Sequence, residues 1–271
     1  MLPHDSYSMD DLLRVMQRLR DPESGCPWDV AQDFRSIVPS TLEECYELAA
    51  AIEHEDYPHV AEELGDVLFQ VVFYAQMGSE QELFDFGQVV STLVAKLLRR
   101  HPHVFLDGQI EGVVEGSHSV DDVKQSWESI KRGEREDKSQ PGALDDVPAA
   151  LPSLPRAQKL QKRAATVGFD WSRAEDVLGA LEQEITELRE AMSGPDRAAV
   201  EDEFGDVLFS AANLARHLGL DAESSLRGAS AKFEGRFRAM ESAAREAGSD
   251  LEELSADELE VLWQRAKQRF R

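Results

Sequence analysis

An internal repeat constrains the fold of this chain more than any other feature. The sequence Gly-Asp-Val-Leu-Phe at residues 65–69 recurs identically at residues 205–209. The same shift of 140 residues aligns three further acidic pairs, namely Glu44 with Glu184, Glu47 with Glu187 and Glu63 with Glu203. A shared apolar pattern alone would not keep charged residues in register. The chain therefore consists of two copies of one unit.

The repeat continues through a set of basic and aromatic residues. After a small deletion the shift becomes 136 residues. It then aligns the first-half residues Lys96, Arg100, Trp127 and Lys131 with the second-half residues Lys232, Arg236, Trp263 and Lys267. Apart from the two tryptophans, the residues retained here are charged, which indicates a function for them beyond packing.

Apolar residues recur with helical spacing along nearly the whole chain, and this pattern predicts an all-α fold. Thr41 and Glu44 have the spacing of a capping box, so we expect a helix to begin at Thr41. Residues 67–73 are apolar around most of a helix circumference, which is typical of a buried helix. No run of alternating β-branched residues bounded by turn signals is evident.

Proline positions divide the chain into two domains. Four prolines and a charged run lie between residues 133 and 155, and prolines this frequent do not fit inside a continuous helix. We therefore predict tandem repeats of one helical bundle: an N-terminal domain at residues 1–132, a linker at 133–155 and a C-terminal domain at 156–271. A length of 271 residues accommodates two such domains.

Charge and hydropathy exclude several classes of partner. The chain has 53 acidic and 29 basic residues, a net charge of −24, and such a surface repels nucleic acid. No apolar stretch approaches the length that spans a membrane, and the N-terminus has no features of a signal peptide. The two cysteines make neither a disulfide framework nor a zinc set. We expect a cytoplasmic protein.

The acidic residues form two predicted metal sites. In each half a Glu-x-x-Glu helix precedes a Glu-x-x-Asp helix, and residues three apart share a helix face. If each helix pair packs antiparallel, four carboxylates converge, and their repulsion calls for a cation. Oxygen ligands favour Mg²⁺, with Mn²⁺ as a substitute, and the absence of Glu-x-x-His argues against a di-iron site. The alternative is a solvated acidic face. The predicted ligands are Glu44, Glu47, Glu63 and Asp66, and Glu184, Glu187, Glu203 and Asp206.

The repeated basic and tryptophan residues are candidate substrate contacts. Lys and Arg bind phosphate, and the face of a Trp ring accepts a base or a sugar. The alternative is that the cations pair with nearby acids and that the tryptophans belong to the core. The candidates are Lys96, Arg100, Trp127 and Lys131 in the first half, and Lys232, Arg236, Trp263 and Lys267 in the second half.

With these motifs the sequence resembles the MazG-type nucleoside triphosphate pyrophosphohydrolases, in their two-repeat form. Residues 25–29 (Gly-Cys-Pro-Trp-Asp), 99–105, 157–163 and 167–171 (Val-Gly-Phe-Asp-Trp) support the resemblance, which runs from about Leu12 to Lys267. It implies a helical bundle, usually dimeric, and Mg²⁺-dependent cleavage of a nucleoside triphosphate to a monophosphate and pyrophosphate. It also implies that the two acidic quartets are the metal ligands.

Two differences between the halves bear on which one is catalytic. Gln183 stands where the first half has Glu43. That position lies about 100° around the helix from the glutamate that follows it, so we do not expect the side chain at this position to bind the metal directly. The Glu203 and Asp206 face continues through Ser210 and Asn213, whereas the first half has Phe73 at the position of Asn213. We therefore expect the second half to be the main catalytic site, with Asn213 among its substrate contacts.

Two other functions remain open at this point. One is a regulator that binds nucleotide and Mg²⁺ without turnover. The other is a pyrophosphatase of the same fold that cleaves a single nucleotide. Release of pyrophosphate separates the first from an enzyme, and a panel of substrates separates the second from a broad enzyme.

Overall fold

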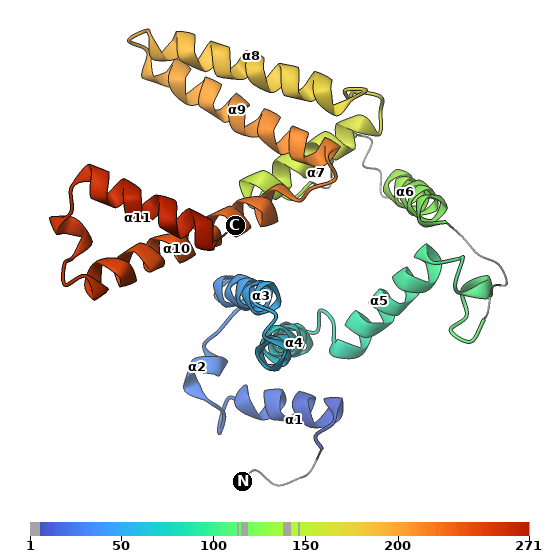
Figure 1. Ribbon diagram of the computed structural model, residues 1–271. Coiled ribbons are helices and arrows are strands. Elements are labelled where there is room, and N and C mark those ends of the chain that lie inside the picture. The colour runs from blue at the N-terminus through green and yellow to red at the C-terminus, as the bar shows by residue number, and fades with distance from the viewer. Residues whose placement is uncertain (1–5, 113, 115–118, 138–141, 146, 271) are drawn as a thin grey trace. The chain divides into compact units, whose positions relative to one another are not determined.

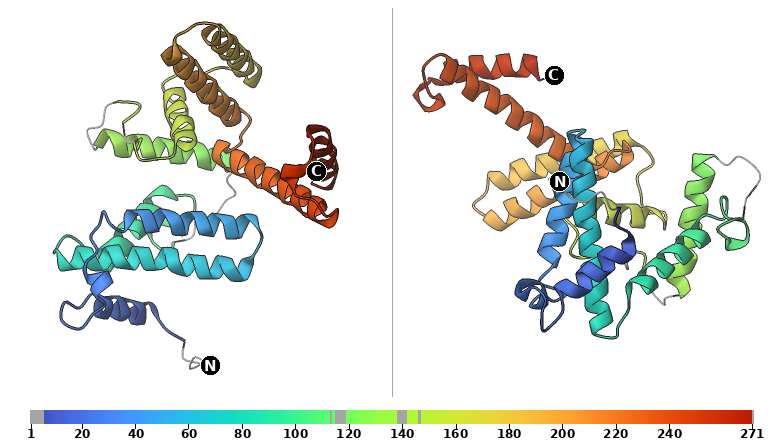
Figure 2. Two further views of the ribbon diagram at one scale, coloured as in Figure 1. Left: turned by 90° about the vertical axis from the view of Figure 1, so that its left-hand side faces the viewer. Right: turned by 90° about the horizontal axis from the view of Figure 1, so that it is seen from below.

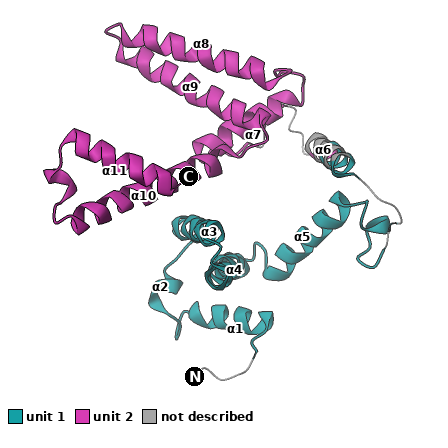
Figure 3. Ribbon diagram, viewed as in Figure 1, with its two compact units in different colours: residues 1–132 teal, residues 133–271 magenta. Residues whose placement is uncertain are grey.

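The computed structural model describes residues 6–112, 114, 119–137, 142–145 and 147–270 (Figure 1). Its regular elements are helices, and no β-strand occurs among these residues, so the all-α prediction is confirmed. The chain divides into two compact units, residues 1–132 and 133–271 (Figure 3). No helix within the described ranges is long and apolar enough to span a membrane.

Six α-helices occur among the described residues of the first unit, and the last of them runs past the boundary between the units. Two of these helices, α3 and α4, form a hairpin that carries the first acidic cluster. The elements are α1 (Met9–Leu19), α2 (Pro27–Val30), α3 (Val38–Glu53), α4 (Tyr57–Glu80), α5 (Phe86–Arg100), the short 3₁₀ helix η1 (Leu106–Gly108) and α6 (Val120–Asp137).

In the part of the second unit that the structure describes, five α-helices begin and end. Here α8 and α9 form the hairpin that corresponds to α3 and α4, and α10 and α11 form another (Figure 1). The elements are α7 (Ser153–Ala165), α8 (Ala174–Met192), α9 (Arg197–His217), α10 (Ala222–Glu246), the 3₁₀ helix η2 (Leu251–Glu253) and α11 (Ala256–Arg269).

Regular helices extend into the predicted linker from both sides. Helix α6 continues to Asp137, and α7 begins at Ser153, so both ends of the 133–155 segment are helical. Residues 138–141 and 146 of that segment lie outside the described residues.

The core of the first unit lies between α1, the α2–α3 connection and α4. Met16, Ile37, Val72, Phe73 and Met77 are fully buried there. Three of them come from residues 72–77 of α4, as expected for a helix that is apolar on most sides. Burying this half of α4 fixes its rotation, and the acidic residues one to three turns earlier therefore point toward α3.

Helix α7 holds the corner between α9 and α10 in the second unit. The side-chain amide of Gln158 donates to the Leu220 carbonyl over 2.9 Å, and its oxygen accepts from the Ala222 amide over 3.1 Å. Gly219, with φ of 71°, ends α9 in the left-handed conformation that glycine adopts freely. From this corner the α8–α9 and α10–α11 hairpins diverge (Figures 1 and 2).

The predicted start of the helix at Thr41 is wrong. Helix α3 begins at Val38, one turn earlier, with Pro39 in its first turn. Proline is favoured there because it has no amide hydrogen to leave unpaired. The Thr41 hydroxyl donates to the Ile37 carbonyl over 3.0 Å from inside the helix, so it does not cap the helix.

Candidate functional site

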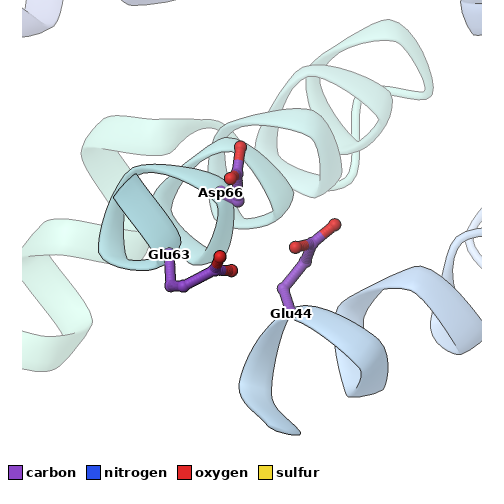
Figure 4. Close-up of side chains that lie close together, drawn as sticks. All are labelled: Glu44, Glu63 and Asp66. Atoms are coloured by element: carbon purple, nitrogen blue, oxygen red, sulfur yellow. The ribbon is translucent and has the colours of Figure 1, made fainter. Parts of the chain in front are cut away.

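The first acidic cluster joins α3 to α4. Carboxylate oxygens of Glu44, from α3, and of Glu63 and Asp66, from α4, all lie within 4.8 Å of one another. Figure 4 shows the three side chains directed toward a common space between the helices. Glu47, the fourth predicted ligand, lies one turn from Glu44 and is exposed outside this group. The structure thus brings together three of the four predicted ligands.

Glu63 is the most informative member of the first cluster. The residue is only 6% exposed, and its Oε2 atom is buried without a hydrogen-bond partner. Its Oε1 atom lies 2.6 Å from Nε2 of His59, one turn earlier on α4. A buried carboxylate oxygen with no partner is costly unless a cation or a donor satisfies it, so the site fits a bound metal ion.

The second acidic cluster lies on the corresponding helices α8 and α9, but it takes two members from the first helix of the pair and one from the second. Carboxylate oxygens of Glu184, Glu187 and Glu203 lie within 4.8 Å of one another. Asp206 is exposed and lies outside this trio. The side-chain amide of Gln183 donates to Glu187 Oε1 over 2.7 Å. Gln183, at the position of Glu43, therefore holds the side chain of Glu187, one of the predicted ligands, by a hydrogen bond.

The clustered carboxylates repel one another, and this repulsion contributes to raised pKa values for three of them. Desolvation, followed by the charges of Asp66, Glu47 and Glu63, raises the pKa of Glu44. Desolvation and the neighbouring carboxylates likewise raise the pKa of both Glu184 and Glu203, and Asp206 contributes to each. Glu47 and Asp206 thus raise the pKa of cluster carboxylates, although neither belongs to the three residues that lie within 4.8 Å of one another. A divalent cation would relieve this repulsion.

Neutralising one member of the second cluster should stabilise the metal-free protein. A raised folded-state pKa means that ionised Glu184 opposes folding at pH 7, and this penalty disappears below the unfolded pKa. We expect Glu184→Gln to raise the melting temperature in chelator at pH 7, with the difference vanishing by about pH 4. Thermal unfolding monitored by circular dichroism measures both values. Glu182→Gln, an exposed position on α8, is the control, and an equal shift in the control would contradict the assignment.

Basic and aromatic residues gather where α10 meets α11. The Arg236 guanidinium lies 5.8 Å and Lys267 Nζ lies 5.7 Å from the centre of the Trp263 ring. Arg236 donates to the Phe270 carbonyl over 2.7 Å, and its Nε is buried without a partner. Lys232 is exposed one turn earlier on α10. No ion pair among the described residues joins this group to the second acidic cluster, because the two hairpins diverge.

The first unit has a similar group on α5 and α6. The Arg100 guanidinium lies 5.7 Å from the Trp127 ring centre, and His101 meets the same ring edge-on at 4.8 Å. Lys96 lies one turn before Arg100 on α5. The side chain of Lys131 falls outside the described part of the structure.

Comparison with known proteins identifies the family. The model of the MazG nucleotide pyrophosphohydrolase domain matches the chain twice, at residues 32–105 and 173–241. The chain belongs to the MazG family. It is 48% identical over 263 residues to the nucleoside triphosphate pyrophosphohydrolase of Escherichia coli K12, covering 96% of this chain and 97% of that protein. It is 42% identical over 258 residues to the nucleoside triphosphate pyrophosphohydrolase/pyrophosphatase MazG of Thermotoga maritima, covering 95% of each chain.

The two MazG regions contain both acidic clusters and the basic residues of α5 and α10, whereas both tryptophan partners follow them in sequence. The match confirms the predicted family and its duplication. Two side-chain contacts with the predicted site residues were not predicted from the sequence. His59 contacts Glu63 in the first MazG region, and Arg216 donates to Asn213 Oδ1 over 2.8 Å in the second. The only signal for His59 was its spacing of four residues from Glu63.

Proposed function

We propose that this MazG protein is a metal-dependent nucleoside triphosphate pyrophosphohydrolase, which cleaves NTPs or dNTPs to a nucleoside monophosphate and pyrophosphate. One observation carries the proposal: each MazG region packs a helix pair so that three carboxylates meet within 4.8 Å. The full-length relatives named as nucleoside triphosphate pyrophosphohydrolases support the same reaction. A net charge of −24 favours free nucleotides over nucleic acid as substrates.

The donor set fits a hard divalent cation. Its ligands are carboxylate oxygens, the class that Mg²⁺ and Mn²⁺ prefer, and the partnerless Glu63 oxygen marks a place for positive charge. We assign Glu184, Glu187 and Glu203, with Asp206 nearby, to hold the ion in the second half. Such an ion supplies phosphate neutralisation and a more acidic bound water. A carboxylate of the cluster accepts the proton of the attacking water, and pyrophosphate leaves when the α–β bridge breaks.

We propose the second half as the main catalytic site because its helix face stays polar beyond the cluster. Ser210 and Asn213 follow Asp206 on α9 and are both partly accessible. On α4 the matching positions are Gln70, which is 5% exposed, and Phe73, which is fully buried. A nucleotide could therefore form hydrogen bonds with side chains along α9, whereas the matching positions of α4 are buried in the apolar core.

We assign phosphate and base contacts to Lys232, Arg236, Trp263 and Lys267, and the corresponding roles in the first half to Lys96, Arg100, Trp127 and Lys131. Because no ion pair among the described residues joins the α10–α11 group to the carboxylates of α8 and α9, we propose a homodimer in which this group meets those carboxylates of a second copy. Exposed apolar side chains on α9 support an interface there, namely Phe204, Leu208 and Phe209. The two free cysteines, Cys26 and Cys45, support a cytoplasmic location.

Pyrophosphate release from a panel of the eight common NTPs and dNTPs tests the proposal. We expect several nucleotides to yield pyrophosphate and monophosphate in equal amounts with Mg²⁺, and none to do so after chelation. Restored turnover on adding Mn²⁺ would show that the metal is exchangeable. Turnover of one nucleotide alone would identify a narrow enzyme. Nucleotide binding without any pyrophosphate would contradict the enzyme and favour a regulator.

A further inference from the structure

Arg216 fixes the orientation of the Asn213 side chain near the C-terminal end of α9. Its Nε and Nη2 atoms lie 3.0 Å and 2.8 Å from Asn213 Oδ1. A guanidinium group only donates hydrogen bonds, so the atom that faces it must be the amide oxygen and not the amide nitrogen. The chemistry of this contact therefore determines which way the amide of Asn213 points.

Asp170, in the loop before α8, holds the guanidinium group of Arg216 in this position. Its Oδ2 atom accepts from Arg216 Nη1 over 3.1 Å, and its Oδ1 atom accepts from Nη2. Nε2 of His217 lies 3.0 Å from the same Oδ1 atom. The side chains of Arg216 and Asp170 are only 18% and 26% exposed. Turning the Asn213 amide around would leave donors of this partly buried guanidinium unpaired, which costs free energy.

The amide nitrogen of Asn213 is left for a ligand. In the part of the chain that the structure describes, no group accepts a hydrogen bond from this nitrogen, and Asn213 is partly accessible. Glu203, Asp206, Ser210 and Asn213 follow one another at steps of three and four residues, so they share one face of α9. The Asn213 amide therefore offers its two N–H donors on the helix face that begins at the second acidic cluster.

A nucleotide whose phosphates are held at this cluster can reach Asn213 with its base. Asp206 and Asn213 are seven residues apart, which is about 10 Å along the helix axis and comparable with the length of a nucleoside. In the opposite direction the same face continues with Ala199, whose side chain forms no hydrogen bond, and with the carboxylate of Asp196. The hydrogen-bonding partners for a sugar and a base therefore lie toward the C-terminal end of α9.

We propose that Asn213 selects nucleotides by donating a hydrogen bond to a keto oxygen of the base, as in uracil, thymine or guanine. This inference rests on the proposed function, because it takes the second acidic cluster to be the place where the triphosphate binds. Cytosine and adenine carry an amino group in place of that oxygen, and two donors that face each other form no hydrogen bond. In the first unit the matching positions hold Phe73 and Gln76, so this selection belongs to the second unit.

A mixture of equal amounts of UTP and CTP in one reaction tests the proposal, because the two bases differ at this keto or amino group. The relative rates of UMP and CMP formation give the ratio of the two kcat/KM values, whatever the total activity. We expect the wild type to prefer UTP by about tenfold, the effect of one hydrogen bond. Asn213→Asp keeps an oxygen toward Arg216 but replaces the donor by an acceptor, so it should reverse the preference in favour of CTP. Asn213→Ala should bring the ratio close to one.

Arg216→Gln tests whether Arg216 acts by positioning Asn213. Glutamine has both a donor and an acceptor, so it allows the Asn213 amide to point either way. The preference for UTP should then fall toward one although Asn213 itself is unchanged. Gln76→Ala, at the matching position of the first unit, is the control and should keep the wild-type ratio.

The outcomes separate this inference from the proposed function. Turnover of both nucleotides with a ratio that Asn213→Asp leaves unchanged would refute the inference alone, because the amide would then not contact the base. Absence of pyrophosphate from every nucleotide would refute the proposed function. Calorimetric titration of the full chain with UMP and with CMP then measures the same preference without turnover, and equal affinities or no binding would overturn the selection by Asn213.

Discussion

Glu203→Gln is expected to lower pyrophosphate release by about 100-fold or more, because removing a direct carboxylate ligand should cost at least as much as losing a residue that only supports one. Glu203 is one of three carboxylates that meet between α8 and α9. Glutamine keeps the size of the side chain but removes its charge and one acceptor oxygen. The raised pKa of Glu203 shows that this carboxylate already feels its neighbours, so a cation held there depends on it.

The matched substitution in the other half is Glu63→Gln. Glu63 occupies on α4 the position that Glu203 occupies on α9. We expect the pyrophosphate release of Glu63→Gln to stay within about twofold of the wild type, because the two clusters lie in separate compact units. Both variants are compared with the wild type for pyrophosphate release at saturating Mg²⁺, after circular dichroism has shown that they are folded. Loss of activity in Glu63→Gln alone would move the main site to the first half. Loss in both would make the two halves interdependent.

The sequence was sufficient to predict which residues converge but not how closely each approaches. Their spacing of three residues places Glu63 and Asp66 on one face of α4. The assumption that α3 packs antiparallel to α4 then brings Glu44 next to them. Glu47 and Asp206 were predicted as equal partners, yet each lies outside the close trio of its half. Such distances depend on the rotation of α4 and α9 about their axes, and burial of the neighbouring apolar residues sets that rotation.

The helical patterns in the sequence could not predict contacts between residues that lie on different helices. Arg100 lies over the Trp127 ring and Arg236 over the Trp263 ring, contacts that the spacings did not predict. The divergence of the α8–α9 and α10–α11 hairpins depends on how α7 packs against both. Asn213 was predicted to contact substrate, and its Oδ1 accepts from Arg216. Arg216 in turn pairs with Asp170, which precedes Arg216 by 46 residues, a separation that no helical periodicity reports.

The residue at which α3 begins was predicted wrongly because two local sequence patterns favour different starting points. Thr41 and Glu44 satisfy the capping-box pattern, but the buried side chain of Ile37 and the helix-starting preference of Pro39 place the first turn of α3 earlier. The apolar run at residues 67–73 is less buried than predicted: Val72 and Phe73 are fully buried, but Val71 is 40% exposed.

Phe73→Ala should destabilise the first unit by about 3–5 kcal/mol, the range for truncating a fully buried phenylalanine. The Phe73 ring lies 5.7 Å from the ring of Phe69 and 5.3 Å from the Arg20 guanidinium, and Met16, Val72 and Met77 are buried with it. These neighbours come from α1 and α4, whose packing closes the core. The cavity left by alanine therefore weakens the contact between the two helices.

Asn213→Ala is the matched change in the second unit, since Asn213 occupies the position of Phe73 in the repeat. Its cost should be about 1.5–3 kcal/mol, the range for hydrogen bonds to a charged group, because the substitution removes only the two hydrogen bonds that Asn213 Oδ1 accepts from Arg216. Hydrogen exchange of peptides from α4 and α9 measures the two units separately in one protein. Phe73→Ala should speed exchange in α4, leave α9 protected and retain pyrophosphate release, because the proposed main site lies in the other unit. Equal destabilisation by the two substitutions would mean that the α9 face is packed as tightly as α4, and the argument for an open nucleotide face in the second half would fail.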